Sequence, residues 1–363
     1  MSATLDEGAG WREIRLDGEG RCNEPVVRSV GVVAQLSDTR ASAPGGLVCP
    51  SCHGALRTLD SSLVCEDCEA SYPVRDGVAS FCSGDEFYEE YLDEHCPYVE
   101  EPAAWKGALL RVLPYWSWRE WRFFRTQLRQ PGAVLDLGCG RGKEWFVRRA
   151  STIAGVDPAR GVLRECAEHY DVVAQAEITH LPFPSNTFDY VLTSHVIGHI
   201  PAAEKDAAFA EIARVLKPGG RSLNIIETDS SHRFVTLGKI DPELYRRNFV
   251  ETDGHVGLEL PSSVLERFRR HGFEIDHVTK MESGLIHLRY YGKFLSIGYP
   301  ERFAHVRRRM RLWDAISRHS AALAVYEIGM GAYHRFVEQR RTRLDDAMFI
   351  AVAAVKREAG ATE

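Results

Sequence analysis

The sequence lacks any stretch of about 18 consecutive apolar residues, the length that a membrane-spanning helix needs, so we expect no transmembrane segment. Its first residues, MSATLDEGAGWREIRLDGEG, carry acidic side chains and contain no apolar core, unlike a secretory signal peptide. These two absences together predict a cytoplasmic protein in a reducing compartment.

The sequence also lacks a strong excess of charge of either sign. Lys and Arg number 45 against 51 Asp and Glu, which gives a net charge of −6. Mild acidity argues against a general nucleic-acid binder but leaves a local basic patch open. A hydrophobic content of 44% and a charged content of 26% exclude global disorder and collagen. A chain of 363 residues is expected to form one large domain with one or two smaller units.

Cysteine, by contrast, is frequent for a reducing compartment, with nine in the chain. Four of them form two CxxC pairs, Cys49 with Cys52 and Cys65 with Cys68. Two such turns can direct four thiolates at one ion, and a tetrahedral set of four sulfurs suits zinc. Unrelated thiols and a redox CxxC are the alternatives. We predict a structural zinc site, which has no open position for water and therefore no catalytic role.

Changes in composition predict four regions. Residues 1–43 are a leader, ordered at most in part, and residues 44–83 are the zinc-ribbon domain. Residues 84–130 form a helical, aromatic-rich linker or cap. Residues 131–363 form the main domain, with a helical insertion at about 284–344 that we expect to lie over the ligand-binding edge of a sheet.

From residue 133 onward, short apolar runs alternate with helical patterns, and this order predicts an α/β fold with a doubly wound, mostly parallel sheet. The expected strands are 133–140, 152–157, 170–177, 188–196, 221–228, 273–281 and 345–358. The expected helices between them are 141–150, 158–170, 203–216 and 261–272. Ser262 or Ser263 is a candidate N-cap of the last helix.

A glycine-rich turn follows the first of these strands. Gly138, Gly140 and Gly142 let the backbone turn sharply and approach a ligand closely. The GxGxG pattern differs from the longer GxGxxG turn of NAD sites. Asp136, just before the turn, disfavours a phosphate and suits a ligand with an ammonium group. Asp157 ends the second strand, where an acid can accept hydrogen bonds from both ribose hydroxyls.

At these motifs the chain resembles a known family. VLDLGCGRG, GVD, LPFPSNTFDYVLTSHVIGHI and RVLKPGG are similar to class I S-adenosylmethionine (SAM) methyltransferases of the ubiquinone-biosynthesis-like group. The resemblance covers 133–228 well, and 261–280 and 345–357 more loosely. It implies a seven-stranded Rossmann-like methyltransferase sheet and SAM as cofactor.

The resemblance also implies which residues contact SAM. The glycines would pass under its methionine and ribose, Asp136 would help to place the amine, and Asp157 would bind the ribose. Ser194 would face the methyl-donor end. The implied cofactor-binding set is Asp136, Gly138, Gly140, Gly142, Asp157, Gln175, Ala176, Glu177 and Ser194. Gln175 stands where the family often has Asp. It would accept from the adenine amino group or be a surface residue.

Two histidines are candidates for the chemistry. His195 and His199 follow the fourth strand of the resemblance, and a base is needed only if the acceptor is an alcohol or a protonated nitrogen. Either could instead pack or hold a loop. Less favoured candidates, which we expect to be structural or to position substrate, are Glu227, Asp229, His255, Tyr290 and Tyr291.

Three functions remain open. The segment TSHVIGH lacks the Asn/Asp-Pro-Pro-aromatic motif of methyltransferases that act on exocyclic amines or glutamine amides, and this disfavours that chemistry. Net acidity, the aromatic-rich segments and the helical insertion favour a small-molecule acceptor, a specialised metabolite or glycan precursor modified at oxygen, nitrogen or carbon. CPSCHGAL, CEDC and YPVRDGV resemble the zinc-ribbon family that activates RNA and translation-factor methyltransferases. An RNA methyltransferase that holds phosphates with the ribbon and Arg307–Arg311 is therefore the alternative. A non-catalytic SAM-binding scaffold is the third. The oligomeric state is not determined by these patterns.

Overall fold

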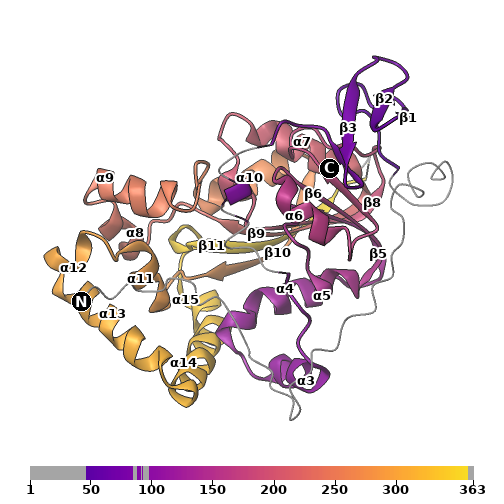
Figure 1. The fold of residues 1–363 in the computed structure, drawn as a ribbon. Helices are drawn as coiled ribbons and strands as arrows, with labels where there is room; N and C mark the ends of the chain where they lie inside the picture. The colour runs from indigo at the N-terminus through magenta and orange to yellow at the C-terminus, as the bar shows by residue number, and fades with distance from the viewer. Residues whose placement is uncertain (1–45, 85–87, 91, 93–97, 359–363) are drawn as a thin grey trace, which may run out of the picture.

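The computed structural model describes residues 46–84, 88–90, 92 and 98–358 (Figure 1). The predicted leader, including its apolar stretch SVGVVAQL, lies outside the described residues. Within the described ranges, none of the helices is both long enough and apolar enough to span a bilayer.

One mixed sheet runs through the described residues, in the order β1-β2-β3-β4-β7-β6-β5-β8-β9-β11-β10. The strands are β1 (Leu56–Leu59), β2 (Ser62–Cys65), β3 (Ser71–Arg75), β4 (Val78–Ser80), β5 (Gly132–Leu137), β6 (Ala150–Asp157), β7 (Val172–Gln175), β8 (Phe188–Ser194), β9 (Leu216–Glu227), β10 (Phe273–Met281) and β11 (Phe349–Lys356). The strands from β7 to β9 pair in parallel, and β11 is antiparallel to both β9 and β10. The predicted doubly wound, seven-stranded sheet is confirmed by the strands β5 to β11.

Helices cover both faces of this sheet because its central strands are apolar on both sides. In β5 every residue is buried, and Val134 and Leu135 point into two different core clusters. One cluster includes side chains of α4 (Arg119–Gln127), α5 (Glu144–Val147) and α6 (Arg160–Cys166). The other includes those of α7 (Lys205–Val215) and α10 (Pro261–Arg270).

The cysteine-rich ribbon extends the edge of the main sheet. Its last strand, β4, pairs antiparallel with β3 and parallel with β7, with Ala79 opposite Ala174 and Ser80 opposite Gln175. The ribbon strands therefore join the sheet beside the strand that precedes Ala176 and Glu177. No spacing in the sequence indicated this pairing.

Helical segments gather on the side of the molecule away from the ribbon (Figure 1). After β9 come α8 (Arg233–Gly238), α9 (Pro242–Tyr245) and a π-helical turn at Arg246–Glu251. After β10 come α11 (Arg289–Phe294), α12 (Tyr299–Arg302), α13 (Ala304–Ser317), α14 (Ser320–Tyr333), a second π-helical turn at His334–Glu338 and α15 (Gln339–Arg341). Upstream, α3 (Ala104–Val112) and a 3-10 turn at Trp116–Trp118 precede α4. We use the term cap for the segments at 233–256 and 289–341.

One local prediction, the N-cap of α10, differs from the structure. Helix α10 begins at Pro261 with Leu260 as its N-cap, so neither Ser262 nor Ser263 caps it. Proline is suited to a first helical position because its missing N–H would have no partner there. Ser262 is instead tied to Asp345, which accepts from its backbone N–H at 2.9 Å.

Candidate functional site: a ribbon of thiols and a two-ended cavity

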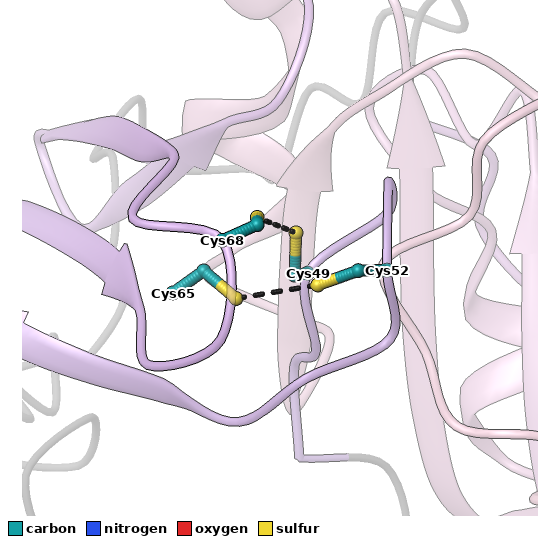
Figure 2. A group of neighbouring side chains, drawn as sticks. All are labelled: Cys49, Cys52, Cys65 and Cys68. Carbon is teal, nitrogen blue, oxygen red and sulfur yellow. Dashed lines mark hydrogen bonds between the residues drawn. The ribbon is translucent and has the colours of Figure 1, made fainter.

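The four predicted cysteines come together at one end of the ribbon (Figure 2). The Sγ atoms of Cys49 and Cys68 are 3.7 Å apart, and those of Cys52 and Cys65 are 3.4 Å apart. All four sulfurs lie within 4.8 Å of one another. Sulfurs bound tetrahedrally to one zinc ion at about 2.3 Å would be separated by about 3.8 Å. The thiols therefore have the spacing that a tetrahedral zinc ion requires.

The two CxxC turns reach this arrangement in the same way. The residue after each pair, His53 and Glu69, has a positive φ, of 60° and 61°. Such left-handed residues reverse the chain directly after the second cysteine of each pair. Tyr72 on β3 places its hydroxyl 3.1 Å from the Cys49 sulfur, a contact that suits a hydrogen bond to a metal-bound thiolate.

A cavity of about 1730 Å³ opens at the carboxyl ends of the central strands. In parallel α/β sheets this edge is where ligands bind, at the point where strand order reverses. Residues that line the cavity from the strand ends and the turns after them are Leu137, Gly138, Asp157, Ala176, Glu177, Ser194, His195 and Glu227. Cap residues 251, 253–256, 289, 290, 293 and 294 also line it.

The glycine turn has the tight backbone that its sequence predicts. Gly138 has a φ of +66°, and a Cβ at this position would lie 2.4 Å from Cγ2 of Val196. The Gly140 N–H donates to Oδ2 of Asp157 at 2.9 Å, and the Ala159 N–H donates to Oδ1, also at 2.9 Å. Asp157 therefore links the turn to the second strand. Each of its oxygens keeps a lone pair for a ligand hydroxyl.

Asp136 lies beneath the turn rather than on the cavity wall. It is fully buried, and its Oδ2 accepts from the Tyr170 hydroxyl at 2.8 Å, with Lys143 Nζ at 3.9 Å. Burial raises the pKa of Asp136 above its usual value, although Lys143 and Tyr170 oppose that shift. Its Oδ1 has no hydrogen-bond partner among the described residues. An ammonium group or a bridging water would satisfy this oxygen.

Only part of the predicted adenine contact set reaches the cavity. Ala176 and Glu177 line it, whereas Gln175 is buried and donates from Nε2 to the Pro158 carbonyl at 2.9 Å. Gln175 braces the loop that follows β6. Gly140 and Gly142 also lie behind the cavity wall, and a Cβ on Gly142 would lie 3.1 Å from the ring of Tyr170.

At the opposite end of the cavity, His195 stands between two carboxylates. Its Nε2 is 3.1 Å from Oε2 of Glu120, and its Nδ1 is in contact with Oε1 of Glu227. Burial disfavours the charged imidazolium, but the two carboxylates outweigh it and raise the pKa of His195 to about 10. The backbone of His195 has a φ of 62°, uncommon outside glycine and often a mark of functional sites.

His199 is neutral, whereas His195 is charged. Burial is the main reason that the pKa of His199 is lowered to about 4, so its ring is neutral at pH 7. Its Nδ1 has no hydrogen-bond partner among the described residues. The ring of His255 lies 4.8 Å away, measured between ring centroids. The two predicted catalytic histidines are therefore close in the chain but differ in protonation, since only His195 is an imidazolium at pH 7.

Glu120 is the site residue that sequence reasoning missed. It lies on α4, and its partner Arg119, 3.5 Å away, is stacked 3.7 Å over the ring of Trp116. Trp116 in turn donates from Nε1 to Glu282 at 2.7 Å. These contacts fix α4 against Glu282, in the segment that follows β10. The predicted aromatic-rich helix was the only signal in this region, and it gave no reason to select Glu120.

The doubly wound sheet, with its glycine turn and its acid at the end of the second strand, defines the class of nucleoside-binding α/β enzymes. Within that class, residues 135–223 match the family described as "Methyltransferase domain". Residues 47–77 match the family described as "Trm112p-like protein". The chain therefore contains a region that matches a methyltransferase domain and, before it, a region that matches the Trm112p-like family.

Curated relatives cover parts of this domain. The tRNA (carboxymethyluridine(34)-5-O)-methyltransferase ALKBH8 of Macaca fascicularis is 29% identical over 43% of this chain and 24% of its own length. A demethylmenaquinone methyltransferase of Symbiobacterium thermophilum is 30% identical over 36% of this chain and 58% of its own. The chain thus spans about three fifths or less of the length of these relatives.

A solved structure, phosphoethanolamine N-methyltransferase 2 of Haemonchus contortus in complex with SAM, has a TM-score of 0.43 and 19% identity. The match covers 75% of this chain and 56% of that one.

Proposed function

We propose that this protein transfers a methyl group from SAM to a small-molecule acceptor held between the strand ends and the cap. The observation that carries the proposal is one cavity lined by two different groups of residues. We call the group formed by the glycine turn and Asp157 the cofactor end, and the group formed by His195, Glu120 and Glu227 the acceptor end. An acceptor in that cavity would be enclosed by cap residues such as Tyr290 and Phe294.

The cofactor end supports SAM through the groups that remain free. Asp157 would accept from the ribose hydroxyls, and the unpartnered Oδ1 of Asp136 would accept from the methionine amine through water. SAM, when bound, supplies a methyl group that is already activated by a positively charged sulfur. The protein's contribution is then mostly alignment of the two reactants and exclusion of water.

The acceptor end supports different roles for its two histidines. His195 is held as an imidazolium with both ring nitrogens engaged, so it would fix the positions of Glu120 and Glu227 rather than act as a base. His199 is neutral and has an unpartnered ring nitrogen, so it is the one with a lone pair to offer. We also infer that Cys49, Cys52, Cys65 and Cys68 hold a structural zinc ion.

The basic segment does not favour the RNA alternative. Arg307, Arg308 and Arg311 on α13 are exposed, and none of them lines the cavity. Arg309 is stacked 5.0 Å over the ring of Tyr291. In this arrangement the arginines form the outer face of a cap helix. Methylation of RNA is therefore kept as one of the possible results of the experiment described next.

The test uses SAM with a radiolabelled methyl group and two acceptor pools, a protein-free and RNA-free metabolite extract and purified total RNA. We expect label to enter the metabolite pool only, together with thermal stabilisation of the protein by S-adenosylhomocysteine. Label in RNA, lost steeply as salt is raised, would replace the proposal with the RNA alternative. Stabilisation without any transfer would favour a scaffold.

A further inference from the structure

Three metal-ligating side chains meet at the acceptor end of the cavity. They are His199, in the 3-10 turn after β8, Glu227, the last residue of β9, and His255, in the loop after the π-helical turn at Arg246–Glu251. One ligand atom from each lies within 4.8 Å of the other two. All three line the cavity. They come from three separate segments, so only the tertiary structure brings them together.

The hydrogen bonding in this cluster is incomplete. Glu227 is only 5% exposed, and its Oε2 has no hydrogen-bond partner among the described residues. Nδ1 of His199 is also buried and has no hydrogen-bond partner among the described residues. Buried polar atoms rarely stay unpaired, because removing such an atom from water without giving it a partner is unfavourable. A ligand that bonds to a carboxylate oxygen and to an imidazole nitrogen at once would remove both deficits.

The orientation of the Glu227 carboxylate is fixed by a neighbouring residue. His195 contacts its Oε1, which leaves Oε2 as the unpartnered oxygen. Nε2 of His255 lies 4.0 Å from Oε1 of the same carboxylate. Bonds of this kind, from a neighbouring residue to a ligating side chain, are typical of metal sites.

We propose that His199, Glu227 and His255 bind a divalent transition-metal ion at the acceptor end of the cavity. Two imidazoles and one carboxylate suit zinc or ferrous iron, and they leave coordination positions open. Because the ligands line the cavity, those positions would be available to an acceptor. The preferred acceptor is then a compound with a hydroxyl group beside a second oxygen, which can chelate the ion. This last step rests on the proposed function, whereas metal binding does not.

The spacing of the ligand atoms is close to that of an occupied site. Ligand atoms about 2.1 Å from one ion can be at most about 4.2 Å apart, and these atoms all lie within 4.8 Å of one another. Rotation of the His199 or His255 side chain would close any remaining gap. This site differs from the ribbon in chemistry, because the ribbon offers only thiolates.

The test uses cobalt(II) as the probe on protein whose ribbon is already loaded with zinc. We expect one further ion per chain, with visible absorption but no sulfur-to-cobalt charge transfer, since no thiolate is involved. His255→Ala and His199→Asn should each weaken cobalt binding at least about tenfold. His305→Ala, which removes an exposed histidine of α13 outside the cavity, should leave it unchanged.

Two results would overturn the metal site: no cobalt bound by the zinc-loaded protein, or equal cobalt affinity in wild type and both variants. Circular dichroism and stabilisation by S-adenosylhomocysteine, measured on the same samples, show whether a variant is folded. They also separate the two proposals. Cofactor binding without a second metal ion defeats only the metal site, and a second ion without cofactor binding defeats only the proposed function.

Discussion

The two ends of the cavity are built in different ways. At the cofactor end the decisive contacts are made by the backbone, as where the N–H groups of Gly140 and Ala159 donate to Asp157. These residues lie close together in the sequence. At the acceptor end the contacts are made between side chains, and Glu120 lies 75 residues from its partner His195. A short motif can specify a backbone turn, but it cannot specify which distant side chains will meet.

The two ends of the cavity also depend on different forces. The cofactor end depends on steric fit, because Val196 leaves no space for a Cβ at position 138. The acceptor end depends on charge, because one imidazolium is balanced by two carboxylates. Substitutions should therefore affect cofactor affinity at one end, and acceptor turnover and pH response at the other.

The largest effect is expected from loss of the ribbon, which abuts the cofactor end through the pairing of β4 with β7. Cys65→Ser removes one of four sulfurs. Because structural zinc contributes about 10–16 kcal/mol to the folding of small zinc domains, we expect loss of bound zinc and of soluble protein. Zinc content and solubility are the measurements. Cys82→Ser, outside the cluster, is the control. A soluble, zinc-free and fully active Cys65→Ser protein would contradict the structural role.

The next effect tests the steric fit of the glycine turn. Gly138→Ala places a Cβ 2.4 Å from Val196 at a left-handed φ. Overpacking and backbone strain together should destabilise the native conformation of the turn by about 2–4 kcal/mol. Calorimetry should show a large loss of S-adenosylhomocysteine affinity. Gly219→Ala is the matched control, because Gly219 also has a positive φ but no atom within 4 Å of the added Cβ. Equal losses in the two variants would mean that strain alone matters.

A smaller loss is expected at Asp157. Asp157→Ala removes the acceptor for the ribose hydroxyls and for two backbone N–H groups, so affinity for S-adenosylhomocysteine should fall by about 1–3 kcal/mol. Asp157→Asn, which keeps the shape and one oxygen, should lose less. Calorimetric affinity equal to that of the wild type in Asp157→Ala would refute the assignment.

At the other end, Glu120→Gln should leave cofactor affinity intact and lower turnover. The amide preserves the volume but removes one of the two charges that hold His195. We expect kcat to fall about tenfold, equivalent to about 1.4 kcal/mol, with S-adenosylhomocysteine affinity within error of the wild type. A variant that loses cofactor affinity instead would show that the two ends are not independent.

The smallest effect is a pH dependence of stability. The pKa of His195 is raised from 6.5 to about 10, so its contribution is complete below pH 6.5 and is lost as pH rises through 10. The pKa of Glu120 is lowered from 4.5 to about 2, so its contribution is lost only as pH falls through 2. The His195 side chain is 36% exposed, and solvent screening should limit the effect to about 1 kcal/mol.

Urea unfolding of wild type and Glu120→Gln is the measurement for this dependence. The difference in unfolding free energy should be largest near pH 6 and should shrink toward pH 10, by the signs given above. A difference that is constant over this range would mean that His195 is not an imidazolium in the folded protein.

The backbone of the glycine turn was largely predictable, and the reason is local. The positive φ values of Gly138, Gly140 and Gly142 follow from a residue type that alone adopts them easily. The ribbon was predictable for a similar reason, because two CxxC turns direct sulfurs at a common point. Gln175 shows the limit of this reasoning. Its position near the site was inferred, but its bond to the Pro158 carbonyl was not.

The sequence by itself determined the parallel sheet, the glycine turn, the acid at the end of the second strand and the thiol cluster, because each is announced by a short pattern within one segment or two successive segments. Only the tertiary structure decided that β4 joins the sheet beside β7, that Glu120 reaches His195, and that His199, Glu227 and His255 share one space. These meetings depend on how separate segments pack, and packing is a property of the whole chain.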